Sequence, residues 1–143
     1  MRNGGMHMRV LVNSTQMKQC DSNTIQHYGV PSQVLMERAA LGVVEEVEKQ
    51  NLSNNNILVV CGSGNNGGDG FAIGRILSQR GYKVTFVLAG DKTKASAETK
   101  QQIKICLAYG ANILDAIPDM EYGAVIDAVF GIGVNREIQG NYY

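Results

Sequence analysis

The sequence has no excess of charge, no long apolar run and few histidines, and each absence excludes a class of protein. Lys and Arg together number 13, as do Asp and Glu, and no basic block stands out. A groove that tracks nucleic-acid phosphates is therefore not expected. No apolar stretch approaches the roughly 20 residues of a membrane span. Segment 1–7 lacks the apolar core of a signal peptide, and we expect a tail there, or an upstream start with Met8 as the natural beginning.

Cysteine and histidine are too scattered for the sites that they usually form. Cys20, Cys61 and Cys106 are odd in number and lack C-x-x-C spacing, which indicates reduced thiols in the cytoplasm. His7 and His27 are the two histidines, and this argues against a zinc site or a serine-type triad. Any chemistry must therefore come from carboxylates, amides and the backbone.

The most informative segment is 61–70, which reads Cys-Gly-Ser-Gly-Asn-Asn-Gly-Gly-Asp-Gly directly after the apolar run 57–60. A strand that breaks into glycines before a helical pattern over 71–80 is typical of a nucleotide-binding α/β domain. Glycines permit a positive φ and let a ligand approach the backbone. The asparagines and the aspartate add side-chain oxygens. The pattern predicts a binding loop.

Two other interpretations of this loop follow from its spacing. Gly62-x-Gly64-x-x-Gly67 matches the dinucleotide fingerprint of an NAD dehydrogenase, with Asp91 at about the expected ~20-residue distance. Asp69 opposes that geometry, because a carboxylate at the helix N-terminus would repel a pyrophosphate. We expect Asp69 to cap the helix, either as a purely structural N-cap or within a functional loop. The lack of Gly-Lys-Ser/Thr argues against a P-loop NTPase.

The rest of the chain predicts alternating strands and helices. Two helices come first, from Ser14 or Thr15 to about Tyr28 and from about Pro31 to Lys49. The second has an apolar face of Met36, Ala40, Val43 and Val47. Later elements are expected at 70–80 (helix), 83–88 (strand), 95–109 (helix), 111–114 and 124–129 (strands), with helix stops at Gly81 and Gly110. This predicts a Rossmann-like three-layer α/β/α fold, with a mostly parallel sheet covered on both faces and preceded by two N-terminal helices.

A second polar group stands late in the strand 124–129. Asp127 lies within an apolar run that leads into the glycine loop 131–136. Ligands collect at the carboxyl ends of parallel strands, which is also where the strand 57–61 delivers its loop. A carboxylate in a buried strand is costly unless it is hydrogen-bonded, paired or bound to a cation. Asp127 therefore either ties down a neighbouring loop or holds a cation.

Several segments together resemble the YjeF N-terminal domain, the family of NAD(P)H-hydrate epimerases. They occur in the family's order from about Leu11 onward: Gln16-Met17-Lys18 with Asp21, 29–32 through 35–40, 62–70 and 127–142. The resemblance implies a domain over 8–143 and an isomerase that interconverts the R and S epimers of hydrated NADH or NADPH in metabolite repair.

The resemblance also implies a substrate site and a potassium ion. The hydrated nucleotide would contact Asn65, Asn66, Gly67, Gly68, Asp69, Gly131, Ile132, Gly133, Val134, Asn135, Arg136 and Glu137. Asn66 and Asp127 would be the potassium ligands, and amide, carboxylate and carbonyl oxygens are hard donors that suit such a cation. Loss and return of hydroxide at the nicotinamide carbon would use acid–base help and charge stabilisation from these loops.

Two departures from the family pattern keep a second hypothesis open. Ile132 replaces a common threonine. The chain ends at Tyr143, whereas the family domain continues to an Asp-x-Pro-Ser-Gly segment with a substrate-contacting aspartate and another potassium ligand. We therefore expect the C-terminal part of the fold to be missing, and the catalytic residue is unknown. The alternative is a catalytically inactive nucleotide- or protein-binding module of the same fold.

Partners and assembly follow from the same expectations. We expect hydrated NADH or NADPH as the substrate, no nucleic-acid or membrane partner, and an NAD(P)H-hydrate dehydratase as a functional partner. A missing neighbour would leave strand 125–130 with an open edge and uncovered apolar side chains, which favours association. The chain is therefore expected to form a homo-oligomer, specifically a dimer.

Overall fold

The computed structural model describes residues 11–132, which fall into two units. The expected tail at 1–7 lies outside the described residues. The described part of the first unit, 11–31, holds helix α1 (Ser14–Gln26). Asn13 caps it in a reciprocal capping box with Gln16, with both hydrogen bonds at 2.9 Å. The predicted cap at Ser14 or Thr15 is wrong, because a glutamine three residues after Asn13 completes the box.

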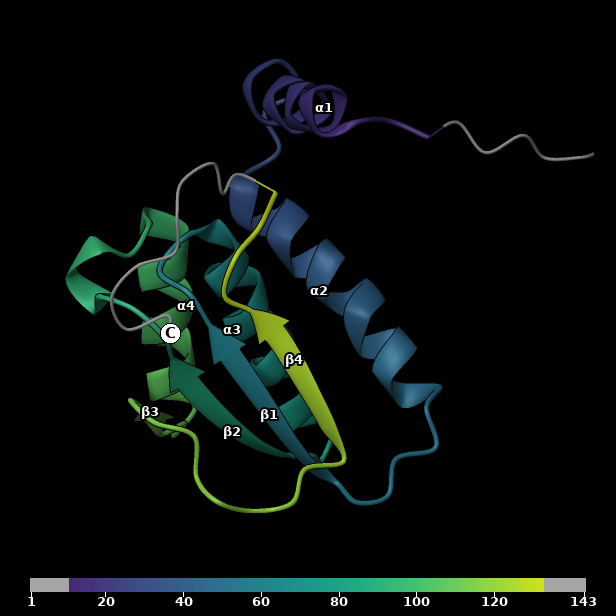
Figure 1. The fold of residues 1–143 in the computed structure, drawn as a ribbon. Helices are drawn as coiled ribbons and strands as arrows, with labels where there is room; N and C mark the ends of the chain where they lie inside the picture. Colours follow the sequence, from purple (N-terminus) through teal and green to yellow (C-terminus); the bar gives the residue numbers. More distant parts are fainter. Residues whose placement is uncertain (1–10, 133–143) are drawn as a thin grey trace, which may run out of the picture. The chain divides into compact units, whose positions relative to one another are not determined.

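The second unit, from Ser32 onward, contains a parallel α/β domain (Figure 1). Its elements are α2 (Ser32–Glu48), β1 (Asn56–Cys61), α3 (Asn65–Gln79), β2 (Lys83–Leu88), the 3₁₀ helix η1 (Lys92–Lys94), α4 (Ala97–Ala108), β3 (Ile113–Leu114) and β4 (Ala124–Ala128). The strand order is β3-β2-β1-β4, and every pair is parallel. The Rossmann-like α/β prediction is confirmed. The chain leaves α3 and α4 through positive-φ glycines, the predicted Gly81 and Gly110.

Alternation along the strands gives the sheet two different faces. Val59 of β1 and Phe86 of β2 belong to one buried cluster with residues of α2, α3 and α4, and the partly buried Ile126 of β4 packs against it. These three helices lie on the same side of the sheet (Figure 1). Val125 and Asp127 alternate with the clustered residues and are exposed. Of the three layers expected, the second unit's described residues therefore form two, the sheet and the helices α2–α4.

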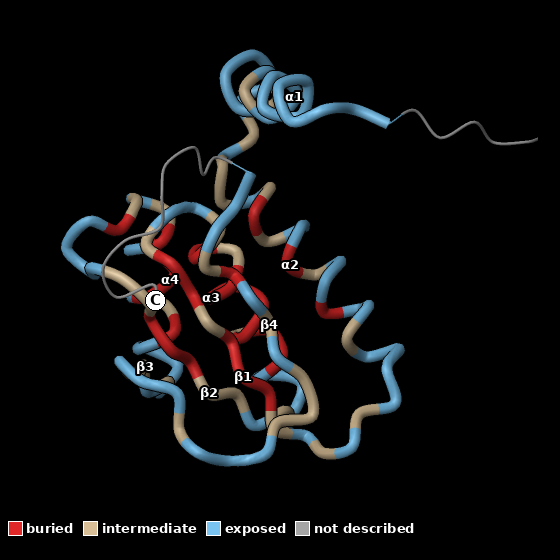
Figure 2. Tube along the Cα trace, viewed as in Figure 1, coloured by how far each residue is buried: buried red, intermediate tan, exposed pale blue. Residues whose placement is uncertain are grey.

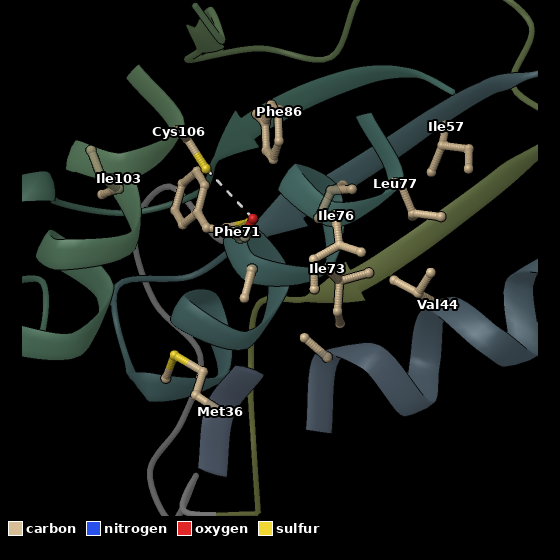
Figure 3. Packing of buried hydrophobic residues seen from close by; sticks show 14 of the residues in the cluster. Met36, Val44, Ile57, Phe71, Ile73, Ile76, Leu77, Phe86, Ile103 and Cys106 are labelled. Atoms are coloured by element: carbon tan, nitrogen blue, oxygen red, sulfur yellow. Dashed lines mark hydrogen bonds between the residues drawn. The ribbon is translucent and has the colours of Figure 1, made fainter. Parts of the chain in front are cut away.

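Buried residues lie on the strands and on the helices beside them (Figure 2), and their hydrophobic side chains pack together between the two (Figure 3). Phe71 of α3 is fully buried and stacks on Phe86, with ring centroids 5.8 Å apart. The Cys106 thiol of α4 donates a hydrogen bond to the main-chain oxygen of Phe71 at 3.5 Å. On α2 the inward residue is Val44, whereas Val43 is 40% exposed, so the predicted inward position of Val43 is wrong. No helix among residues 11–132 is long and apolar enough to cross a membrane.

Helix α3 lies close to the sheet because glycines face the strands. A Cβ on Gly70 would stand 2.5 Å from the Cβ of Ala128 and 2.9 Å from the sulfur of Cys61. A Cβ on Gly74 would stand 2.4 Å from a ring carbon of Phe86. These distances are well below van der Waals contact, so a side chain at either position would push the helix away from the sheet.

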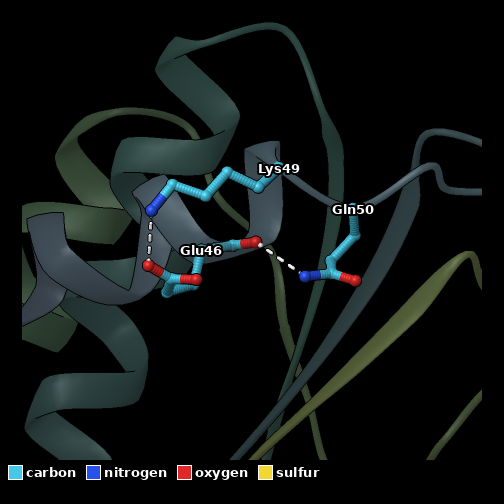
Figure 4. Close-up of polar contacts among 3 residues, drawn as sticks. All are labelled: Glu46, Lys49 and Gln50. Carbon is cyan, nitrogen blue, oxygen red and sulfur yellow. Dashed lines mark hydrogen bonds and ion pairs between the residues drawn. The ribbon is translucent and has the colours of Figure 1, made fainter.

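Helix α2 also forms polar contacts outside the buried core. Just after the end of α2 the Lys49 ammonium lies 2.6 Å from a Glu46 carboxylate oxygen, and the Gln50 side-chain amide donates to the Glu46 carbonyl (Figure 4). The hydrogen bond and charge of Glu46 raise the pKa of Lys49. Arg75 of α3 pairs with Glu37 of α2 and is largely buried. That pair joins the two helices, whereas the exposed Lys49 pair adds little stability.

Replacing Gly74 by alanine should destabilise the domain. The added methyl group would collide with Phe86, and overpacking of this kind costs about 1–3 kcal/mol. Gly42→Ala is the matched control, because Gly42 lies within α2 and a Cβ there would meet nothing within 4 Å. That control should gain up to about 1 kcal/mol from helix propensity. Urea unfolding measures both, and equal stability of the two variants would contradict the close approach of α3.

The buried thiols should make stability fall at alkaline pH. Burial raises the pKa of Cys61, and it raises that of Cys106 from 9.0 to about 11 although Arg75 opposes the shift. Below pH 9 these thiols are neutral in both states and contribute nothing. Above pH 9 they ionise first in the unfolded chain, so the free energy of unfolding falls as pH rises towards about 11.

Urea unfolding under reducing conditions at pH 7, 9 and 10.5 tests this dependence. Cys106→Ala should lose less stability than the wild type between pH 9 and 10.5, by roughly 1 kcal/mol per pH unit. Cys20→Ala, which changes an exposed thiol, should follow the wild type. Parallel curves for all three proteins would show that burial does not hold the Cys106 thiol neutral.

Candidate functional site

The glycine-rich segment lies where β1 ends and α3 begins. Helix α3 starts at Asn65, and its N-cap is Gly64, which offers no side-chain hydrogen bond. The Gly67 amide donates to the Gly64 carbonyl at 2.9 Å. Asp69 therefore lies inside the helix, half-buried, and the prediction that it caps a helix starting near residue 70 is wrong. Residues 65–68 form the first turn of α3 rather than a loop.

The glycines of this segment serve close packing of the backbone. None of them has a positive φ, so that part of the sequence interpretation is wrong. A Cβ on Gly67 would stand 1.8 Å from the Gly62 carbonyl oxygen, and a Cβ on Gly62 would stand 2.1 Å from the Val129 carbonyl oxygen. The first turn of α3 thus lies against the end of β1, which lies against the end of β4. A helix can start here because glycine removes these collisions.

The carboxyl ends of β1 and β4 are joined by hydrogen bonds. The Gly62 amide donates to the Ala128 carbonyl at 3.0 Å. Beyond the strands, the Asn66 side-chain amide donates to the Phe130 carbonyl at 3.1 Å. A Cβ on Gly131 would stand 3.3 Å from the Cβ of Asn66, so the two predicted nucleotide segments touch at these residues.

Asp127 stands on the exposed face of β4. One oxygen of its carboxylate accepts a hydrogen bond from the Val129 amide at 3.0 Å. The sequence predicted a costly carboxylate within a buried strand, and the structure corrects this. Asp127 alternates with the partly buried Ile126 and the buried Ala128, so it points to the face opposite α3. Exposure removes the desolvation cost, and the bond to Val129 ties down the start of the following loop.

Of the predicted substrate residues, the structure describes seven. Asn65, Asn66, Gly67, Gly68 and Asp69 lie in the first two turns of α3, and Gly131 and Ile132 follow β4. Ile132 is 69% exposed. Gly133, Val134, Asn135, Arg136 and Glu137 lie outside the described residues.

The chemistry of this edge is that of hydrogen-bond donors and hard oxygens. The main-chain amides at the start of α3 lie at the positive end of the helix dipole and can donate hydrogen bonds to an anionic group. The bond from Asn66 to Phe130 sets the direction of the Asn66 amide, whose oxygen is a hard donor like the Asp127 carboxylate. Residues 11–132 contain no group of three or more His, Cys, Asp or Glu that could hold a metal. The oxygens of Asn66 and Asp127 are hard donors, of the kind that alkali and alkaline-earth cations take and transition metals take less readily.

Asp91, the aspartate of the dinucleotide spacing, has a local structural role. Its carboxylate accepts hydrogen bonds from the Thr93 amide at 2.8 Å and the Thr93 hydroxyl at 2.6 Å, which caps η1. The side-chain and main-chain hydrogen bonds from Thr93 lower the pKa of Asp91.

Sequence reasoning missed two contacts from α4. Ser96, the N-cap of α4, donates its amide to the Ser63 carbonyl at 2.9 Å, and the Thr99 hydroxyl donates to the Gly64 carbonyl at 2.8 Å. The available signal was Ser96 itself, a good N-cap residue at the start of a predicted helix. Its link to the glycine-rich segment depends on the tertiary fold.

Comparisons with known proteins identify the family of this chain. Residues 32–143 match the family model described as YjeF-related protein N-terminus. Proteins named NAD(P)H-hydrate epimerase are 42% identical over 133 residues in Oenococcus oeni and 39% identical over 128 residues in Weissella koreensis. These matches cover 92% and 89% of this chain, and 63% and 58% of the relatives.

A solved structure extends the likeness to the fold. The crystal structure of yeast ynu0 superimposes with a TM-score of 0.75 and 23% identity, covering 94% of this chain and 62% of that one. The chain thus spans roughly three fifths of the length of the relatives that it matches. Because the family model covers the chain from α2 to the last residue, this chain belongs to the family of YjeF-related protein N-termini.

Proposed function

We propose that this chain carries the nucleotide-facing part of an NAD(P)H-hydrate epimerase, which interconverts the R and S forms of hydrated NADH and NADPH. The name borne by the relatives in Oenococcus oeni and Weissella koreensis supports the reaction. Within the structure, the observation that carries the proposal is the hydrogen bond from Asn66 to Phe130, which joins the two segments expected to hold the nucleotide.

The first turn of α3 supplies the groups for one part of the substrate. Asn65 and Asn66 present main-chain amides at the positive end of the helix, whereas the Gly67 amide donates to the Gly64 carbonyl. Asp69 lies further along the helix and so does not stand at its N-cap, where a carboxylate would compete for those amides. In the proposal the segment 131–137, which follows β4 in the sequence, contacts the same nucleotide.

Asn66 and Asp127 are the proposed ligands of a potassium ion. The amide oxygen of Asn66 and the carboxylate of Asp127 are the oxygen donors that such a cation takes. When bound, the ion would supply positive charge next to the nucleotide as hydroxide leaves and returns. The hydrogen bonds to Phe130 and from Val129 orient the two side chains without any ion.

The reaction can be tested with the R epimer of NADPH hydrate. The purified chain should convert it to the S epimer, and chromatography measures the rate of this conversion. Replacing potassium by the larger tetramethylammonium ion should lower that rate. Asn66→Ala and Asp127→Asn should each lower kcat/KM by about 10- to 100-fold, the usual scale for a disturbed metal site. Asp119→Asn, which changes an exposed loop carboxylate, should keep the wild-type rate.

Calorimetric titration with NADPH hydrate separates the possible failures. Binding without turnover would contradict the enzymatic function and favour a nucleotide-binding module of the same fold. Absence of both binding and turnover would overturn the proposed site. If the rate depends neither on potassium nor on the Asp127→Asn change, the chain is an epimerase, but the proposed cation takes no part in the reaction.

We further propose that the chain associates as a homodimer through β4. This strand pairs with β1 on one side, and no described strand pairs with its other side. Val125 is 61% exposed, and Asp127 is the only charged residue in 124–128. Such an edge is a template for another strand.

The three cysteines are free, which supports a cytoplasmic location. A dehydratase acting on the same hydrate would be the functional partner there.

Sedimentation velocity over a concentration series tests the association. The wild type should shift towards the dimer as its concentration rises. Val125→Lys should raise the concentration needed for dimerisation by at least tenfold, because a lysine on an edge strand opposes pairing. Leu107→Lys, which changes an exposed apolar residue on α4, is the matched control. A wild type that stays monomeric at all concentrations would rule out the dimer.

A further inference from the structure

Thr99 is a buried polar residue that bonds outside its own helix. Its side chain is fully buried, and in the described part of the chain only Gln102 joins it as a buried polar or charged residue. The Thr99 hydroxyl donates to the Gly64 carbonyl at 2.8 Å and accepts from the Ser96 hydroxyl at 3.0 Å. A buried hydroxyl is costly without such partners, so both bonds are part of what keeps Thr99 in this position.

The start of α4 thereby holds two consecutive carbonyls of the glycine-rich segment. The Ser96 amide binds the Ser63 carbonyl at 2.9 Å, next to the bond between Thr99 and Gly64. The Thr99 amide in turn donates to the Ser96 hydroxyl at 3.2 Å. The same Thr99 hydroxyl oxygen would stand 3.0 Å from a Cβ on Gly68. Thr99 therefore contacts α3 at its N-cap and again four residues later.

The N-cap of α3 receives no side-chain hydrogen bond of the usual kind. Gly64 carries no side chain, and the structure shows no side-chain cap for α3. Helices usually receive that anchor from a Ser, Thr, Asp or Asn at the cap. At α3 an anchor comes instead from Thr99 on a neighbouring helix, through the carbonyl of the cap residue.

We propose that Thr99 is a positioning residue for the nucleotide site. Its hydroxyl holds Gly64 and packs on Gly68, and this fixes the turn between them, which contains Asn65 and Asn66. Thr99 acts through these residues and does not touch the nucleotide. The proposal rests on the proposed function for its effect on substrate, whereas its effect on the turn itself is independent of any reaction.

Two substitutions at Thr99 separate the hydroxyl from the shape of the side chain. Thr99→Val keeps the shape and removes the hydrogen bonds, and Thr99→Ser keeps the hydroxyl. Without nucleotide, Thr99→Val should speed hydrogen exchange of the Gly67 and Gly68 amides by roughly tenfold, the effect of losing the buried hydrogen bond to Gly64. Its KM for NADPH hydrate should rise by a similar factor with a smaller change in kcat, and Thr99→Ser should restore both values.

The matched control is Thr24→Val, because the Thr24 hydroxyl also donates to a main-chain carbonyl at 2.8 Å, within α1. It should leave exchange at Gly67 and Gly68 unchanged. Ser96→Ala, which removes the hydroxyl that donates to Thr99, should speed exchange of the same amides less than Thr99→Val does, and it serves as the test if Thr99→Val does not fold.

Wild-type exchange at Gly67 and Gly68 in Thr99→Val, or in Ser96→Ala if that variant is needed, would overturn the proposal. Faster exchange with an unchanged KM would overturn its link to the substrate. If the wild type itself neither binds nor epimerises the hydrate, the proposed function fails, and the exchange data alone decide whether Thr99 positions the turn.

Discussion

The structure depends on one close approach, that of the first turn of α3 to the ends of β1 and β4. Gly67 lies against the Gly62 carbonyl, and Gly62 lies against the Val129 carbonyl, at distances that leave no room for a Cβ. This contact brings the side chain of Asn66 next to the loop after β4. The hydrogen bond from Asn66 to Phe130 follows from it, and so does the meeting of the two proposed substrate segments.

The fold class was predictable because its signals are local and repeated. Apolar runs at β1 and β2 alternate with helical patterns, and the stops at Gly81 and Gly110 carry the positive φ that a helix end uses. The beginning of α3 was not predictable in the same way. Four glycines and two asparagines within 65–74 indicate a loop by propensity, and only contacts with distant residues make them helical.

In the candidate site, too, some features could be predicted from local sequence and others depend on the tertiary fold. Asn66 could be named as a candidate because its sequence context is distinctive, and in the structure its side chain bonds to Phe130 at the start of the second segment. Asp127 was also identified, but its environment was not: an apolar run predicts a buried strand, whereas β4 lies at the edge of the described sheet with one exposed face. Thr99 was missed, because a threonine in an amphipathic helix looks the same whether its hydroxyl meets water or the carbonyl of a neighbouring helix.

The composition of α3 also bears on the order in which the protein can fold. Four of its fifteen residues are glycine, which weakens the isolated helix by about 3–4 kcal/mol relative to alanine. The segment cannot hold a stable helix in the unfolded chain and becomes helical only when β1 and β4 are there to receive it. Because β4 comes late in the sequence, this pairing closes a long loop and is slow to form. We therefore expect the turn that would bind the nucleotide to become ordered only once β4 has paired with β1.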